Sequence, residues 1–131
     1  KSSTRTKILQ EIIESDTHLH CFVFGQADVL TLRYSLADGR YLPEIVVIDN
    51  TFDRDLAEDA IAITKAYGYD INMVEFVVKD GKTYIINGNN PAPDIDQALM
   101  TAEQFTWCVA KTVKVAIDRA KQPLPQQTIF H

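Results

Sequence analysis

Short apolar runs separated by turn-forming residues fill the first third of the chain. Three of them, at residues 7–13, 18–25 and 28–34, are rich in β-branched and aromatic residues, which predicts three strands. The second and third runs lie so close together that we expect them to pair as a hairpin. Turn signals follow over 35–43, and the apolar run at 44–48 fits either a strand or an irregular lead into a helix.

Helical spacing begins near residue 50. Asn50 or Thr51 is expected to cap a first helix, and Gly68 is expected to end it. Its buried stripe is predicted to contain Leu56, Ala60, Ile63 and Tyr67.

A second hairpin and a second helix follow. Strands are predicted over 71–78 and 83–87, and a loop with two prolines leads from them to a helix that begins at a capping box of Thr101 and Gln104. The tail at 123–131 is expected to lie over the surface or to fray. The core face of the second helix is expected to contain Phe105, Cys108, Val109, Val113 and Ala116.

These elements predict an α+β fold, an antiparallel sheet with two helices packed on one face. At 131 residues the chain has room for one core, so residues 1–131 are interpreted as a single domain. The chain opens without an initiating Met or a signal-peptide pattern, and we therefore expect a fragment of a longer chain.

The composition narrows the choice of partners. A net charge of −5 argues against a nucleic-acid partner. No apolar run approaches the roughly 20 residues that span a bilayer, so no membrane role is predicted. Cys21 and Cys108 fit neither a metal-ligand spacing nor a disulfide framework, and the apolar residues around them predict buried free thiols in a cytoplasmic protein.

The candidate chemistry lies in the second hairpin. Glu75 stands among apolar residues on a predicted strand, where a carboxylate must be solvated, paired or bound to something. Asn87 and Asn89 end the next strand, although asparagine is depleted from strands. Oxygen ligands of this kind suit Mg²⁺, which takes one or two protein carboxylates and completes its shell with water and phosphate.

The turn of this hairpin decides whether these side chains meet. A two-residue turn at Asp80-Gly81 places Glu75 opposite Ile86 and directs the asparagines to the other face. A three-residue turn with a bulge places Glu75 opposite Ile85 instead, so that Glu75 and Asn87 share a face. The order Lys-Asp-Gly-Lys favours the bulged turn.

An acidic residue on a strand, followed after a hairpin by an acidic-x-Asn motif and prolines, is the metal signature of the ATP-grasp superfamily. The stretch from Glu75 to Pro93 resembles this signature. The superfamily includes glutathione synthetase, D-alanine–D-alanine ligase and the ribosomal-protein glutamate ligases. Upstream, LQEII at 9–13 resembles the strand that holds adenine, and residues 18–25 and 29–34 resemble the next two strands. The resemblance covers residues 7–119 and implies the C-terminal half of an ATP-grasp domain.

This resemblance implies an ATP-dependent carboxylate–amine ligase. In that reaction a carboxylate attacks the γ-phosphate of ATP, and an amine then displaces phosphate from the acylphosphate to leave an amide. The implied partners are ATP, small-molecule or peptide substrates that carry the carboxylate and the amine, and the missing N-terminal half of the same chain. The implied Mg²⁺ ligands are Glu75 and Asn89, with Asn87 as a weaker third. The implied nucleotide contacts are Gln10, Glu11, Ile12 and Ile13 at the adenine, His18 and His20 at the ribose and phosphates, and Arg33 at a phosphate.

The sequence also departs from the pattern of the superfamily. Asn87 stands where an acidic residue is usual, which lowers the charge of the site unless Asp94 or Asp96 compensates. His18 and His20 stand where many relatives have an acidic residue and an arginine. A second interpretation is therefore a degenerate ATP-grasp module with a binding or assembly role.

Each candidate residue also has a purely structural interpretation. These are a surface carboxylate for Glu75, a loop-bracing amide for Asn87, helix-entry residues for Asp94 and Asp96, a sheet-edge salt bridge for Arg33, and half-exposed strand positions for His18 and His20.

Overall fold

The computed structural model describes residues 17–43 and 51–122, with side chains from residue 54 onward in the second range. Within these ranges the chain forms five strands and two helices. Their bounds are β1 Thr17–Phe24, β2 Asp28–Ser35, β3 Arg40–Tyr41, α2 Thr51–Tyr67, β4 Ile71–Lys79, β5 Lys82–Asn87 and α3 Ala102–Lys121. The predicted strand at 7–13, the run at 44–48 and the tail at 123–131 lie outside the described residues.

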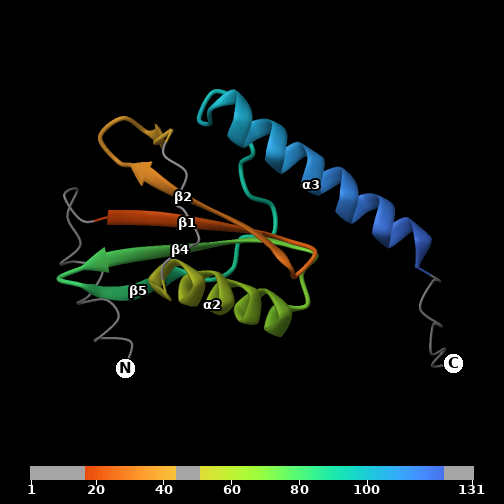
Figure 1. The fold of residues 1–131 in the computed structure, drawn as a ribbon, viewed down its shortest axis with the longest axis horizontal. Helices are drawn as coiled ribbons and strands as arrows, with labels where there is room; N and C mark the ends of the chain where they lie inside the picture. The colour runs from red at the N-terminus through yellow and green to blue at the C-terminus, as the bar shows by residue number, and fades with distance from the viewer. Residues whose placement is uncertain (1–16, 44–50, 123–131) are drawn as a thin grey trace, which may run out of the picture.

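The five strands form one antiparallel sheet in the order β3-β2-β1-β4-β5 (Figure 1). β1 lies at its centre and pairs with both β2 and β4. The predicted hairpin of β1 and β2 is confirmed, since Phe24 pairs with Asp28. The turn signals over 35–43 predict no strand, but Arg40 and Tyr41 form β3, because two residues are too few to show a strand period.

The prediction of an α+β fold is confirmed, but the two helices pack on opposite faces of the sheet and not on one. One set of β1 side chains packs against α2, in a cluster that includes Leu19, Cys21, Val23, Leu56 and Ala60. The alternate set packs against α3, in a cluster that includes Phe22, Phe24 and Cys108. Because β1 is apolar on both sides, each side needs a cover. The face that carries Leu19 is called the α2 face below, and the face that carries Phe22 is called the α3 face.

The predicted stripe of α2 is confirmed at three of its four positions. Leu56 and Ala60 are buried, and Ile63 packs beside them. Tyr67 is instead 51% exposed and stacks on Tyr69. The reason is that Thr64, which is fully buried, is the last residue of α2 that faces the sheet.

The predicted stripe of α3 is confirmed at Phe105 and Cys108, which pack on the α3 face. Val109, Val113 and Ala116 are exposed instead. The fully buried residues of α3 are Gln104 and Cys108, so this helix meets the sheet along a line narrower than its apolar stripe. The predicted capping box of Thr101 and Gln104 is confirmed.

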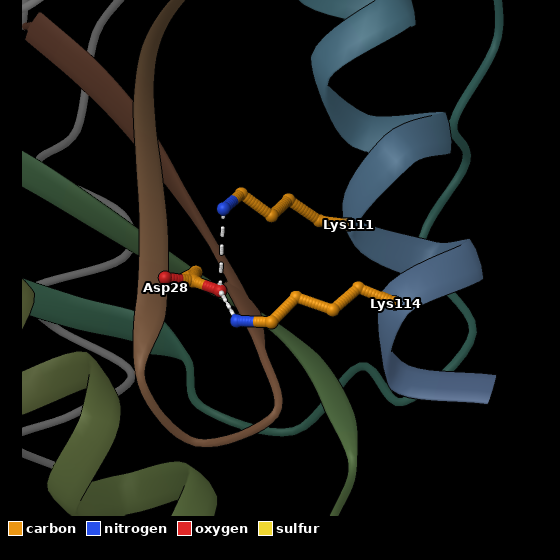
Figure 2. Close-up of polar contacts among 3 residues, drawn as sticks. All are labelled: Asp28, Lys111 and Lys114. Carbon is orange, nitrogen blue, oxygen red and sulfur yellow. Dashed lines mark hydrogen bonds and ion pairs between the residues drawn. The ribbon is translucent and has the colours of Figure 1, made fainter. Parts of the chain in front are cut away.

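Two lysines join α3 to the start of β2 (Figure 2). The Nζ atoms of Lys111 and Lys114 lie 3.4 Å and 3.3 Å from Oδ2 of Asp28. Lys111 also lies over the ring of Trp107, 5.3 Å from its centroid. Because partly exposed ion pairs add little stability, this contact contributes little to the attachment of α3.

Both predicted free thiols are confirmed. Cys21 and Cys108 are buried and form no disulfide. Burial raises the pKa of the Cys108 thiol to about 11, which keeps it protonated and unreactive at neutral pH. Neither α2 nor α3, the helices of the described ranges, has the length and apolar character that crossing a bilayer requires.

Asn72 is a buried polar residue that joins three parts of the fold. Its side-chain amide donates to the hydroxyl of Thr64 in α2, at 3.2 Å, and to the backbone carbonyl of Gly88, at 3.0 Å. Its side-chain oxygen accepts from the backbone N–H of Asn90 at 2.8 Å. The amide thereby fixes the segment after β5 against both β4 and α2.

We expect Asn72→Ala to destabilise the fold by about 3 kcal/mol, because it leaves the carbonyl of Gly88 and the N–H of Asn90 without these partners. Chemical denaturation followed by circular dichroism measures the loss. Asn90→Ala is the matched control, since the bonds of Asn90 described here use its backbone atoms. This control is expected to change stability by less than about 0.5 kcal/mol. Equal losses in the two variants would contradict the role of the Asn72 amide.

Candidate functional site

The turn between β4 and β5 has two residues, so the predicted bulged turn is wrong. Lys79 pairs with Lys82, and both turn residues have positive φ, 51° at Asp80 and 75° at Gly81. Positive φ at both central positions belongs to a type I′ turn, for which Asp-Gly is a favoured pair. The two-residue turn is favoured over the bulged turn because its twist matches the right-handed twist of the two strands.

A bulge lies further along the same hairpin. Phe76 pairs with Ile85, but Glu75 pairs with Asn87, so Ile86 is an extra residue in β5. Directly paired residues lie on the same face of a sheet. Glu75 and Asn87 therefore share the α3 face. The sequence predicts a shared face for these two residues, but from a bulge in the turn, whereas the bulge lies at Ile86.

A row of paired residues crosses the α3 face at this level. Leu32 of β2 pairs with His20 of β1, His20 with Glu75 of β4, and Glu75 with Asn87 of β5. The structure thus brings together three of the predicted site residues, His20, Glu75 and Asn87, from three strands.

Glu75 lies in surroundings that disfavour its charge. Its side chain is half-buried, and this burial raises the pKa of the carboxyl, while the charge of His18 acts in the opposite direction. Within residues 17–43 and 54–122, no ion pair involves Glu75. A cation beside this carboxylate would offset the cost of its burial.

Asn87 and Asn89 are exposed residues at the end of β5 and just beyond it. The backbone N–H of Asn89 donates to Oδ1 of Asn87 at 3.1 Å, so the loop-bracing interpretation of Asn87 is confirmed. The same oxygen has a second lone pair and retains the capacity to bind a cation. Asn72 bonds to Gly88 and Asn90, on either side of Asn89, so buried bonds set the position of Asn89.

Two tyrosines hold the ring of His20. The ring stacks on Tyr34, with centroids 4.9 Å apart and planes 9° apart, and the ring of Tyr41 meets it edge-on at 5.3 Å. The hydroxyl of Tyr41 lies 2.7 Å from Nδ1 of His20. Burial, with a further effect of His18, lowers the pKa of His20 to about 4. His20 is therefore neutral at pH 7, unlike the arginine that the resemblance leads one to expect here.

His18 lies on the same face, one row from His20, and pairs with Tyr34 and Val77. It is 6% exposed, so the half-exposed interpretation is wrong for His18, whereas it holds for His20. Its Nε2 atom has no hydrogen-bond partner in the part of the chain that the structure describes.

The remaining candidates lie apart from this row. Arg33 pairs with Leu19, so it lies on the α2 face, where it is exposed. Asp96 accepts the N–H of Ala98 at 2.8 Å and so braces the turn before α3. The helix-entry interpretation is wrong for Asp96, because the N-cap of α3 is Thr101. The predicted adenine contacts, residues 10–13, lie outside the described ranges.

Asp94 is exposed but lies close enough to the site to act on it electrostatically. The pKa of the Tyr41 hydroxyl is raised, first by burial and then by neighbouring groups that include Tyr34, Glu75 and Asp94. The neighbouring Ile95 packs against the cluster on the α3 face, and a compensating role for Asp94 stays a prediction.

Three residues around the site are missed by the sequence patterns. One of them, Asn72, could have been found from the sequence, because an asparagine inside an apolar strand indicates a buried hydrogen-bonding role. Tyr34 reaches His20 across the pairing of β1 with β2. Tyr41 reaches it only because β3 returns beside β2, which no local pattern of the 35–43 segment shows.

In the part of the chain that the structure describes, carboxylates, thiols and imidazoles do not form a metal centre by themselves. Among residues 17–43 and 54–122, no three His, Cys, Asp or Glu side chains gather closely enough to hold an ion. A metal ion beside Glu75 would therefore draw on amide oxygens, water and oxygens of a ligand, as Mg²⁺ commonly does.

The chain matches no family model and no curated protein. It is similar to a solved structure of a D-alanine–D-alanine ligase from Bacillus anthracis complexed with ATP, with a TM-score of 0.53 and 16% identity over 89% of the chain. The match spans 44% of the ligase, so the chain corresponds to less than half of that protein. At this identity the likeness shows the fold alone. The chain has the α+β fold of the C-terminal part of an ATP-grasp domain, as the motifs predict.

Proposed function

We propose that the chain is the metal-binding half of an ATP-dependent carboxylate–amine ligase. The observation that supports this most is the row of His20, Glu75 and Asn87 on one face of a sheet with the ATP-grasp fold. The ligase of similar fold is complexed with ATP, which favours a nucleotide as the ligand of this face.

Glu75, Asn87 and Asn89 fit Mg²⁺ as oxygen ligands with one carboxylate among them. The half-burial that raises the pKa of Glu75 makes a bound cation favourable at this point. Asn89 is kept in place by the bonds of Asn72 on either side of it, and Asn87 adds a neutral oxygen. When bound, Mg²⁺ neutralises charge on the phosphates and so assists phosphoryl transfer.

In the proposed reaction a carboxylate oxygen bonds to the γ-phosphorus of ATP as ADP leaves. The amine nitrogen then bonds to the acyl carbon, phosphate leaves, and the nitrogen gives up a proton. In this half of the protein the residues hold and orient the phosphates, which is most of what phosphoryl transfer requires of a protein. The carboxylate and amine substrates, small molecules or peptides, and the cover over the nucleotide are assigned to the N-terminal half. The proposed site does not include Arg33, because Arg33 lies on the α2 face and the row of His20, Glu75 and Asn87 lies on the α3 face.

A degenerate module that binds or assembles without catalysis is the second candidate. Two observations favour it: the neutral Asn87 beside Glu75, and the neutral ring of His20, whose pKa is lowered to about 4. The row therefore has one carboxylate and no cation, which makes it a weaker site for magnesium and triphosphate. Magnesium-dependent binding of ATP separates the two candidates.

We expect the longest natural chain that contains these residues to bind ATP in a magnesium-dependent way. Glu75→Ala is expected to weaken that binding by more than about tenfold, because it removes the one carboxylate of the row. Isothermal titration calorimetry with and without magnesium measures both effects. Glu58→Ala is the matched control, since Glu58 is an exposed residue of α2, and it is expected to leave the affinity unchanged.

Two results would count against the ligase. Equal affinities for the Glu75→Ala and Glu58→Ala variants would exclude Glu75 as a metal ligand. Absence of ATP binding by a folded full-length protein would instead favour the degenerate module.

The raised pKa of Glu75 also predicts a stability effect with a definite sign. Since the folded state holds this proton more tightly than the unfolded state, the stabilising effect is complete below pH 4.5 and is lost as the pH rises through the folded-state pKa. Glu75→Gln, which cannot ionise, is therefore expected to be more stable than the wild type at pH 7 without magnesium. Denaturation midpoints at pH 7 and pH 4 measure this, and the difference is expected to shrink at pH 4. A less stable Glu75→Gln protein at pH 7 would contradict the prediction.

A further inference from the structure

The ring of His20 is held in one orientation by contacts on its face and its edge. Tyr34 lies against its face, nearly parallel at 9°, and Tyr41 meets it at 76°. The hydroxyl of Tyr41, 2.7 Å from Nδ1, fixes the rotation of the ring in its own plane. The Nδ1 edge therefore faces β3, and Nε2 lies away from Tyr41.

The hydrogen bond between Tyr41 and His20 has a preferred direction. Tyr41 is 5% exposed, and among the described residues its hydroxyl bonds to Nδ1 of His20. If Nδ1 donated the proton, the hydroxyl proton of Tyr41 would itself need an acceptor in this buried place. A buried donor without an acceptor costs more than an oxygen with an unused lone pair. Tyr41 therefore donates, and Nδ1 accepts.

This direction places the ring proton of His20 on Nε2. A neutral imidazole carries one N–H, and a hydrogen bond accepted at Nδ1 leaves that N–H at Nε2. The imidazolium also has a proton on Nε2, so the donor exists in either charge state. The tautomer that lacks it, with the proton on Nδ1, is the one that the Tyr41 hydroxyl disfavours.

We propose that Tyr41 is a positioning residue that fixes the Nε2–H tautomer of His20, and that His20 gives a phosphate oxygen of the nucleotide a hydrogen bond in place of a positive charge. The proposal rests on the proposed function, since it assigns the phosphates to the row of His20, Glu75 and Asn87. His20 is the direct cross-strand neighbour of Glu75, so a phosphate held at Glu75 through a metal ion lies within reach of this donor.

Amide substitutions separate the two ring nitrogens. The amide nitrogen of glutamine reaches about as far as Nε2, and that of asparagine about as far as Nδ1. We expect His20→Gln to keep magnesium-dependent ATP affinity within about threefold of the wild type, and His20→Asn to lose about tenfold. Tyr41→Phe keeps the aromatic ring but removes the hydroxyl, and is expected to lose about three- to tenfold.

Nitrogen-15 NMR of histidine-labelled protein reads the tautomer directly and needs no nucleotide. The wild type is expected to show the Nε2–H signature for His20, assigned by its absence in His20→Gln. Tyr41→Phe is expected to give a mixture of tautomers. Tyr34→Phe is the matched control, because it keeps the stacked ring without touching the hydrogen bond at Nδ1, and it is expected to leave the tautomer unchanged.

Several outcomes would overturn the proposal. An Nδ1–H tautomer in the wild type, or a tautomer unchanged by Tyr41→Phe, would remove the role of Tyr41. Equal ATP affinities of His20→Gln and His20→Asn would remove the Nε2 contact. No magnesium-dependent ATP binding by the wild type would remove the phosphate contact together with the proposed function, and the NMR result would then show whether the tautomer itself had been assigned correctly.

Discussion

The meeting of Glu75 and Asn87 depends on one extra residue in β5. Ile86 forms the bulge that lets Glu75 pair with Asn87, whereas the two-residue turn at Asp80-Gly81 alone would set Glu75 opposite Ile86. Side chains alternate along a strand, so a shift of one residue exchanges the two faces. The bulge therefore turns two polar residues that would lie on opposite faces into a cross-strand pair, with His20 beside them.

The row of His20, Glu75 and Asn87 carries little charge. Glu75 is its one carboxylate, and its burial disfavours the ionised form. His20, on the other side of Glu75, is neutral because two aromatic rings shield it from water. Under the proposed function, hydrogen-bond geometry would hold a phosphate here more than net charge would, and such binding would depend less on ionic strength.

The local elements of the fold could be predicted from the sequence, and the long-range relations could not. Gly68 and the capping box of Thr101 and Gln104 act within a few residues. The end of α2 and the start of α3 could therefore be predicted from the sequence. The bulge at Ile86 could not, because Lys-Asp-Gly-Lys fits both kinds of turn and the pairing with β4 decides between them. Cys108 and Val109 lie three and four residues after Phe105, so helical spacing places both on the apolar stripe of α3. Only the packing of α3 on the sheet shows that Cys108 is buried and Val109 exposed.

The buried amide of Asn72 has a consequence for the motion of this face. Since it bonds Thr64, Gly88 and Asn90 together, the segment that carries Asn89 cannot leave β4 without breaking bonds that α2 shares. Opening of that segment therefore removes two partners of a buried amide that also contacts α2, so we expect it to be costly. The backbone at Asn89 is in this sense preorganised, and a ligand that binds there loses little free energy to ordering the loop.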